Sequence, residues 1–199
     1  AATVRLSNSP ASVVLHWATA MAFIAALGAM TIFAYCAHGP TQGRPSRYEL
    51  ALAGLLAGTS LIAFATMCVG AYVSSSGAGL ACLSIPGCAG NVVVYTQGQY
   101  VQMLHRIIAG STLLCAAASM ALAWARPASA RVRTAVSVAL ALVFVQVFLG
   151  LLNVALRLPM DLREAHAANA ALVFLAFIAA SVFALLDSSA FAERSLARR

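Results

Sequence analysis

Five long apolar segments constrain the fold of this chain more than any other feature. They cover about residues 13–35, 48–72, 99–124, 134–156 and 162–186. Each is close to the length of about 20–25 residues that an α-helix needs to cross a bilayer. Only 9% of the 199 residues are charged, whereas soluble domains carry about 25%. We therefore expect an all-α membrane protein whose five transmembrane helices form an antiparallel bundle.

The positive charges indicate how this bundle is oriented. All twelve basic residues are arginines, and eight of them lie in the connections after the first and third segments or in residues 188–199. The positive-inside rule explains this distribution and the net charge of +7 without a nucleic-acid partner. We expect a protein integral to a bacterial or archaeal cytoplasmic membrane. Its C-terminus would be cytoplasmic, and the loop over about residues 73–98 would lie outside.

The outer loop carries two cysteines, Cys82 and Cys88. Disulfides persist in oxidising compartments such as the periplasm, which agrees with the side that the charges assign to this loop. The pair can be interpreted as a structural clip or as a redox-active dithiol, and a disulfide clip that orders the loop is the simpler choice. Metal binding is less favoured because the loop contains no histidine and no second cysteine pair.

Two histidines, His105 and His166, each follow the predicted start of a segment by about five residues, on the same side of the membrane. Ionisable residues inside spans are costly and point to function. Two imidazoles facing each other in a helix bundle are what a six-coordinate heme iron requires. The alternative is that each histidine hydrogen-bonds a neighbouring helix. His16 and His38 are better explained as an interfacial and a solvated residue.

Arg106 is adjacent to His105 and could pair with a heme propionate, because the guanidinium fork suits a carboxylate. The alternative is an interfacial arginine whose charge extends to water. This second explanation fits Arg157 and Arg163 better than Arg106, which lies beside a loop without charged residues.

Three stretches of the sequence resemble the heme A synthase family. They are SSSGAGLACLSIPGCAG with its paired cysteines, LHRIIAG around His105, and QVFLGLLNVALRLPMDLREAHAANAALVF with His166. Heme A synthases have eight spanning helices in two similar four-helix halves, each with a histidine pair, and oxidise a methyl group of heme O to the formyl group of heme A.

The resemblance implies a division of the chain into three parts. Residues 48–187 would form one four-helix half, preceded by an additional helix and loop in residues 1–47 and followed by a basic tail in residues 188–199. His105 and His166 would be the axial ligands of a heme b, with heme O or heme A as substrate or product. Cys82 and Cys88 would form the loop disulfide.

One departure from the family leaves the activity open. The family has a glutamate three residues before the first histidine of its catalytic half, and here Gln102 stands at that position. An amide can hydrogen-bond, and we count Gln102 among the cofactor-binding residues, but it cannot act as a general base. Glu164, near His166, is the substitute that the sequence offers.

Two other functions therefore remain beside an oxidoreductase for oxidase heme. The first is a non-enzymatic cytochrome b subunit for electron transfer in a respiratory or photosynthetic complex. The opening SPASVVLHWATAMAF, which is similar to the first helix of small quinol-linked cytochromes b, favours it. The second is a heme-free structural subunit. In each case we expect a homo-oligomer or a place in a larger membrane complex.

Overall fold

The computed structural model describes residues 9–36, 47–85, 87–88, 90, 93–126 and 128–196, with side chains up to residue 187. Long helices make up nearly all of this described part. They are α2 (Pro10–Cys36), α3 (Arg47–Ser75), α4 (Gln97–Ala125), α5 (Ala130–Ala155) and α6 (Met160–Leu196), with a short 3₁₀ turn η1 (Ala78–Leu80) after α3. The expected all-α architecture is confirmed.

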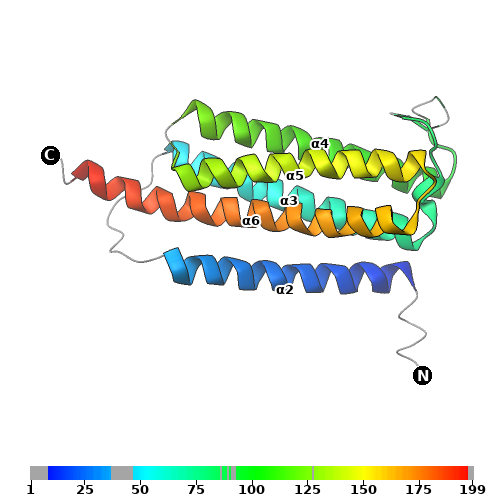
Figure 1. The fold of residues 1–199 in the computed structure, drawn as a ribbon, viewed down its shortest axis with the longest axis horizontal. Coiled ribbons are helices and arrows are strands. Elements are labelled where there is room, and N and C mark those ends of the chain that lie inside the picture. Colours follow the sequence, from blue (N-terminus) through cyan, green and yellow to red (C-terminus); the bar gives the residue numbers. More distant parts are fainter. Residues whose placement is uncertain are drawn as a thin grey trace, which may run out of the picture.

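Four of these helices, α3 to α6, form an antiparallel bundle (Figure 1). Each packs against the next along the chain, and α6 closes the bundle by packing against α3. The α3–α4 and α5–α6 connections therefore lie at one end, which we call the loop end, and the α4–α5 connection lies at the other. Helix α2 lies outside the bundle against α3 and α6.

Polar side chains at the helix starts explain where several of these helices begin. The hydroxyl of Ser9 accepts the Ser12 amide before α2, and Thr96 and Gln99 form a capping box at the start of α4. Ser129 accepts the Val132 amide at the start of α5. Such caps satisfy amide groups that the first helical turn leaves without partners. Helix α5 consequently starts four residues earlier than predicted, which places Arg131 and Arg133 in its first turn instead of in the loop.

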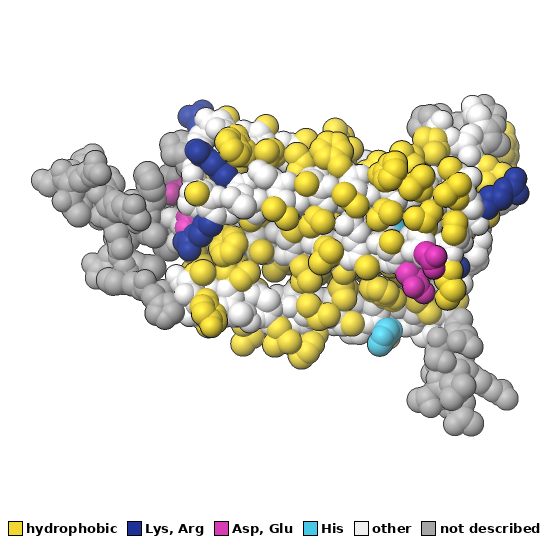
Figure 2. Space-filling model, in the orientation of Figure 1, with side chains coloured by type: hydrophobic (Ala, Val, Ile, Leu, Met, Phe, Trp, Pro, Cys, Tyr) yellow, Lys and Arg dark blue, Asp and Glu magenta, His cyan; other side chains and the backbone are white. Residues whose placement is uncertain are grey.

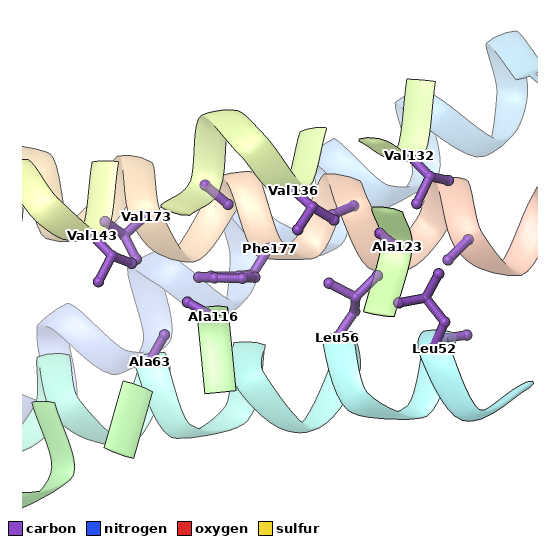
Figure 3. Packing of buried hydrophobic residues seen from close by; sticks show 14 residues of the cluster. Leu52, Leu56, Ala63, Ala116, Ala123, Val132, Val136, Val143, Val173 and Phe177 are labelled. Atoms are coloured by element: carbon purple, nitrogen blue, oxygen red, sulfur yellow. The ribbon is translucent and has the colours of Figure 1, made fainter. Parts of the chain in front are cut away.

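The bundle core consists of small and branched side chains around one aromatic ring (Figure 3). Phe177 of α6 is completely buried between Ala116 of α4 and Val136 of α5, with Leu56 of α3 farther along the same core. Alanines let helix backbones approach closely, which is how helices commonly associate in a lipid environment. The alanine-rich composition therefore produces a tightly packed bundle.

The outer surface of the bundle is apolar along its length (Figure 2). Large side chains such as Phe33, Leu114 and Phe148 are more than half exposed, and five helices are long and apolar enough to cross a membrane. The last of these spans ends at Asp187, although α6 continues to Leu196. Exposed apolar surface on this scale is compatible with lipid as the surrounding solvent.

At the loop end, the two connections pack against each other through Gly79 and Leu158. A Cβ atom at position 79 would lie 2.8 Å from Cδ1 of Leu158, so the leucine fills the space that the glycine leaves. Arg157 and Leu158 both have positive φ values, 60° and 63°, which is uncommon for residues other than glycine. The α5–α6 connection thus turns sharply enough to place Leu158 over the cysteine loop.

Candidate functional site

The imidazoles of His105 on α4 and His166 on α6 face each other near the loop end. Their ring centroids are 6.5 Å apart and their planes are inclined by 70°. His105 follows the first residue of α4 by eight positions and His166 follows that of α6 by six, so both lie deeper than the predicted five. The expectation that the two rings share one depth and one interior position nevertheless agrees with the structure.

Each imidazole ring lies against a glycine of the preceding helix. A Cβ atom at Gly70 of α3 would lie 3.0 Å from Cε1 of His105, and one at Gly150 of α5 would lie 3.2 Å from Cε1 of His166. A side chain at either position would press on the ring, which would have to move by a few tenths of an ångström. The glycines therefore let both imidazoles approach the backbone of a neighbouring helix, and the two halves of the site repeat the same arrangement.

Both histidine rings carry a buried nitrogen without a partner. The Nδ1 atoms of His105 and His166 are shielded from solvent and make no hydrogen bond within the described part of the chain. A buried polar group without a partner costs about 1–3 kcal/mol. The bundle thus holds two imidazole rings side by side, and the protein provides hydrogen-bond partners for only some of their nitrogen atoms.

Gln102 is buried one turn before His105, and both ends of its amide contact the cysteine loop. Its Oε1 accepts the Cys82 amide at 2.5 Å, and its Nε2 donates to the Gly79 carbonyl at 2.7 Å. We counted Gln102 among the cofactor-binding residues. In the structure it connects α4 to the loop through one donor and one acceptor, a combination that a glutamate carboxylate does not offer.

Arg106 connects the same helix to the same loop. Its guanidinium donates to the carbonyl oxygens of Ser84, Gly87 and Cys82 at 2.7, 2.9 and 2.7 Å. Hydrogen bonds from a charged donor are among the stronger ones in proteins. The Arg106 guanidinium, which we expected to bind a heme propionate, therefore stabilises the loop above the histidine pair.

The cysteine loop is compact where it is described. The sulfur atoms of Cys82 and Cys88 are 2.10 Å apart, and both residues are almost fully buried. Cys36, Cys68 and Cys115, which do not take part in this contact, are half-buried. With Gln102 and Arg106, the cysteine pair defines what we call the clamped loop.

The remaining sequence candidates lie apart from the ring pair. His16 and Glu164 are exposed, and Arg163 is exposed with one contact of 3.3 Å to the Ser74 hydroxyl. Arg157 lies in the α5–α6 connection and is exposed. His38 lies outside the described residues. The exposed position of Glu164 does not place its carboxylate beside the buried rings.

Sequence reasoning missed a polar network behind His166. The Gln146 amide nitrogen lies 3.1 Å from Nε2 of His166, and the buried Asn169 donates to Gln146 at 2.8 Å. A signal was present, because Gln146 interrupts an apolar segment and Asn169 follows His166 by three positions, which places them on one face of a helix.

The fold and the site define a class: an integral membrane helix bundle with an interior histidine pair beneath a clamped loop. A family model described as COX15-CtaA, cytochrome oxidase assembly protein, matches residues 1–178. The chain belongs to this family, the heme A synthase family, which confirms the resemblance. The matched range includes α2.

One curated relative is similar to part of the chain. The chain is 36% identical over 97 residues to a protoheme IX farnesyltransferase of Halobacterium salinarum (strain ATCC 29341 / DSM 671 / R1). The similar region covers 48% of this chain and 21% of the relative. The chain thus matches about a fifth of that protein's length.

Proposed function

We propose that this protein binds heme b through His105 and His166 and acts in the biogenesis of oxidase heme. The separation of the two rings carries the proposal. A metal–imidazole bond is about 2 Å long, so two imidazoles on opposite sides of one metal ion have ring centres about 6 Å apart. The observed 6.5 Å fits this requirement without a large movement of either helix.

Two further features support the fit. Gly70 and Gly150 let each ring lie close to the backbone of the neighbouring helix, and the two rings lie side by side between α4 and α6. A bound heme would supply one-electron redox chemistry at this place. His105 and His166 would hold the heme iron, and the clamped loop would lie over the site.

The reaction that we propose within heme biogenesis is oxidation of the heme O methyl group to the formyl group of heme A. Family membership supports it. Gln102 favours the alternative, a cytochrome b subunit that transfers electrons without chemistry on the porphyrin. Its amide is occupied by the clamped loop, and it cannot accept a proton as a carboxylate does.

We further propose that the clamped loop faces the outer, oxidising side of the membrane. Arg47, Arg126, Arg131 and Arg133 lie at the opposite end, next to the α4–α5 connection or at the start of α3, as the positive-inside rule requires of a cytoplasmic end. An oxidising compartment would keep Cys82 and Cys88 as a disulfide. A homo-oligomer or a larger membrane complex would complete the assembly.

The test is a reduced-minus-oxidised visible spectrum of the purified protein, followed by acid extraction and mass analysis of its heme. Low-spin heme b in the wild type that is lost in both His105→Ala and His166→Ala supports the site. His16→Ala is the matched control, since His16 is exposed and its loss should leave the spectrum unchanged. Retention of the signal in both site variants would refute the ligand assignment.

The extracted heme separates the two functions. Heme b accompanied by heme O, its hydroxylated form or heme A supports the synthase. Heme b alone supports the electron-transfer subunit. Size-exclusion chromatography with light scattering, corrected for bound detergent, measures the oligomeric state of the same sample.

A further inference from the structure

The network behind His166 begins at a backbone carbonyl group, which can only accept hydrogen bonds. The Leu142 carbonyl accepts from Nδ2 of Asn169 at 3.0 Å, and the same Nδ2 donates to Oε1 of Gln146 at 2.8 Å. Because the carbonyl can only accept, the group of Asn169 that faces α5 must be its NH₂ group. The same NH₂ group donates to Gln146, so the Gln146 atom next to Asn169 must be the oxygen, Oε1.

This chain of contacts determines the protonation of the His166 ring. With its oxygen turned to Asn169, Gln146 presents its NH₂ group to Nε2 of His166 at 3.1 Å. Nε2 must then be the acceptor, so the neutral ring carries its proton on Nδ1. That Nδ1 is buried and has no hydrogen-bond partner.

In most metal sites, the nitrogen that does not bind the metal makes the contact that selects the tautomer. Here the contact is made on the other nitrogen. We propose that Asn169 and Gln146 hold His166 in the tautomer with its proton on Nδ1, and that the Gln146 amide occupies the Nε2 lone pair until a metal coordinates there. This inference rests on the proposed heme site.

The proposal predicts opposite effects for two substitutions at one position. Gln146→Leu removes the competing amide, so hemin should bind about two- to tenfold more tightly, as the net value of one hydrogen bond suggests. Gln146→Glu introduces a carboxylate that accepts from a protonated Nε2, which favours the wrong tautomer, so hemin should bind at least about tenfold more weakly. Asn153→Leu is the control, because it removes another buried amide of α5 that does not contact His166.

Spectral titration of the detergent-solubilised protein with hemin measures these affinities through the low-spin absorption bands. Opposite shifts for the two Gln146 variants, with little change for Asn153→Leu, support the proposal. Equal losses in both Gln146 variants, or no change in either, would overturn it, because a residue that only fills space has no reason to distinguish leucine from glutamate in this way.

A second measurement needs neither a variant nor heme. In heme-free protein labelled with ¹⁵N-histidine, the His166 resonances, assigned by their absence in His166→Ala, should show a protonated Nδ1 and an unprotonated Nε2. A protonated Nε2 would overturn the proposal even if hemin binds normally. Failure of the wild type to form low-spin heme, with the expected tautomer present, would instead refute the proposed function.

Discussion

The imidazole of His105 lies directly on Gly70, so that a methyl group at position 70 would come within 3.0 Å of Cε1. The same relationship links His166 to Gly150 on the other side of the site. The positions of both rings therefore depend on the absence of a side chain on a neighbouring helix.

Replacing either glycine by alanine should displace the imidazole that it supports. Overpacking of this kind typically costs about 1–3 kcal/mol, so we expect Gly70→Ala and Gly150→Ala each to weaken hemin binding by about tenfold or more. Hemin titration measures the effect. Gly110→Ala is the matched control, because a Cβ at Gly110 meets no atom within 4 Å; an equal loss in this control would contradict the explanation.

Arg106→Gln should release the clamped loop. The substitution removes the charged donor that contacts three loop carbonyls, and we expect a loss of about 2 kcal/mol or more in local stability. Hydrogen exchange of the loop amides should then be at least about tenfold faster. Arg163→Gln provides the comparison at the same end of the bundle, since Arg163 makes one longer contact from an exposed position and should have little effect.

Gln102→Glu should weaken the loop instead of simply restoring the family's glutamate. A carboxylate can still accept the Cys82 amide, but it places negative charge against the Gly79 carbonyl that now receives a hydrogen bond. We expect faster exchange at the loop amides and no gain of formyl-heme. Detection of heme A in this variant, with the loop unchanged, would show that the amide at position 102 alone limits the chemistry.

Arg131 and Asp187 form an ion pair at the end opposite the loop, and Ser129 donates to the same carboxylate. The side chains are 39% and 20% exposed, so we expect a coupling energy of only about 0.5–1 kcal/mol. A double-mutant cycle with Arg131→Gln and Asp187→Asn, measured by unfolding in mixed detergent micelles, gives this value. A coupling of several kcal/mol would mean that the pair is far less accessible to solvent than described.

Much of the fold follows from hydrophobic segment length alone. The five predicted segments agree with the observed helices, and the differences lie at the ends. Ser129 lengthens α5 because a capped first turn can include arginines, which a hydropathy pattern assigns to the loop. The packing of α2 against α3 and α6 depends on tertiary contacts such as the cluster of Met21 and Ala25 with Phe174, which no local pattern specifies.

The candidate site was predictable in its histidine pair but less so in its surroundings. His105 and His166 are conspicuous because histidine is costly inside a membrane. The roles of Gln102 and Arg106 were not predictable, because their partners are loop carbonyls and amides, and every residue has these. Gly70 and Gly150 were also missed, since a glycine in an alanine-rich helix gives no sign of the ring that lies against it.

The contact between Gly79 and Leu158 has a consequence for how relatives of this protein can vary. With only 2.8 Å between Cδ1 and a Cβ at position 79, a larger residue at position 79 requires the Leu158 side chain to move or a smaller residue to replace it. The two positions are far apart in sequence but should covary across the family, with alanine or serine at position 79 accompanied by valine or a smaller residue at position 158. The α3–α4 and α5–α6 connections, which meet at the loop end, should therefore diverge together.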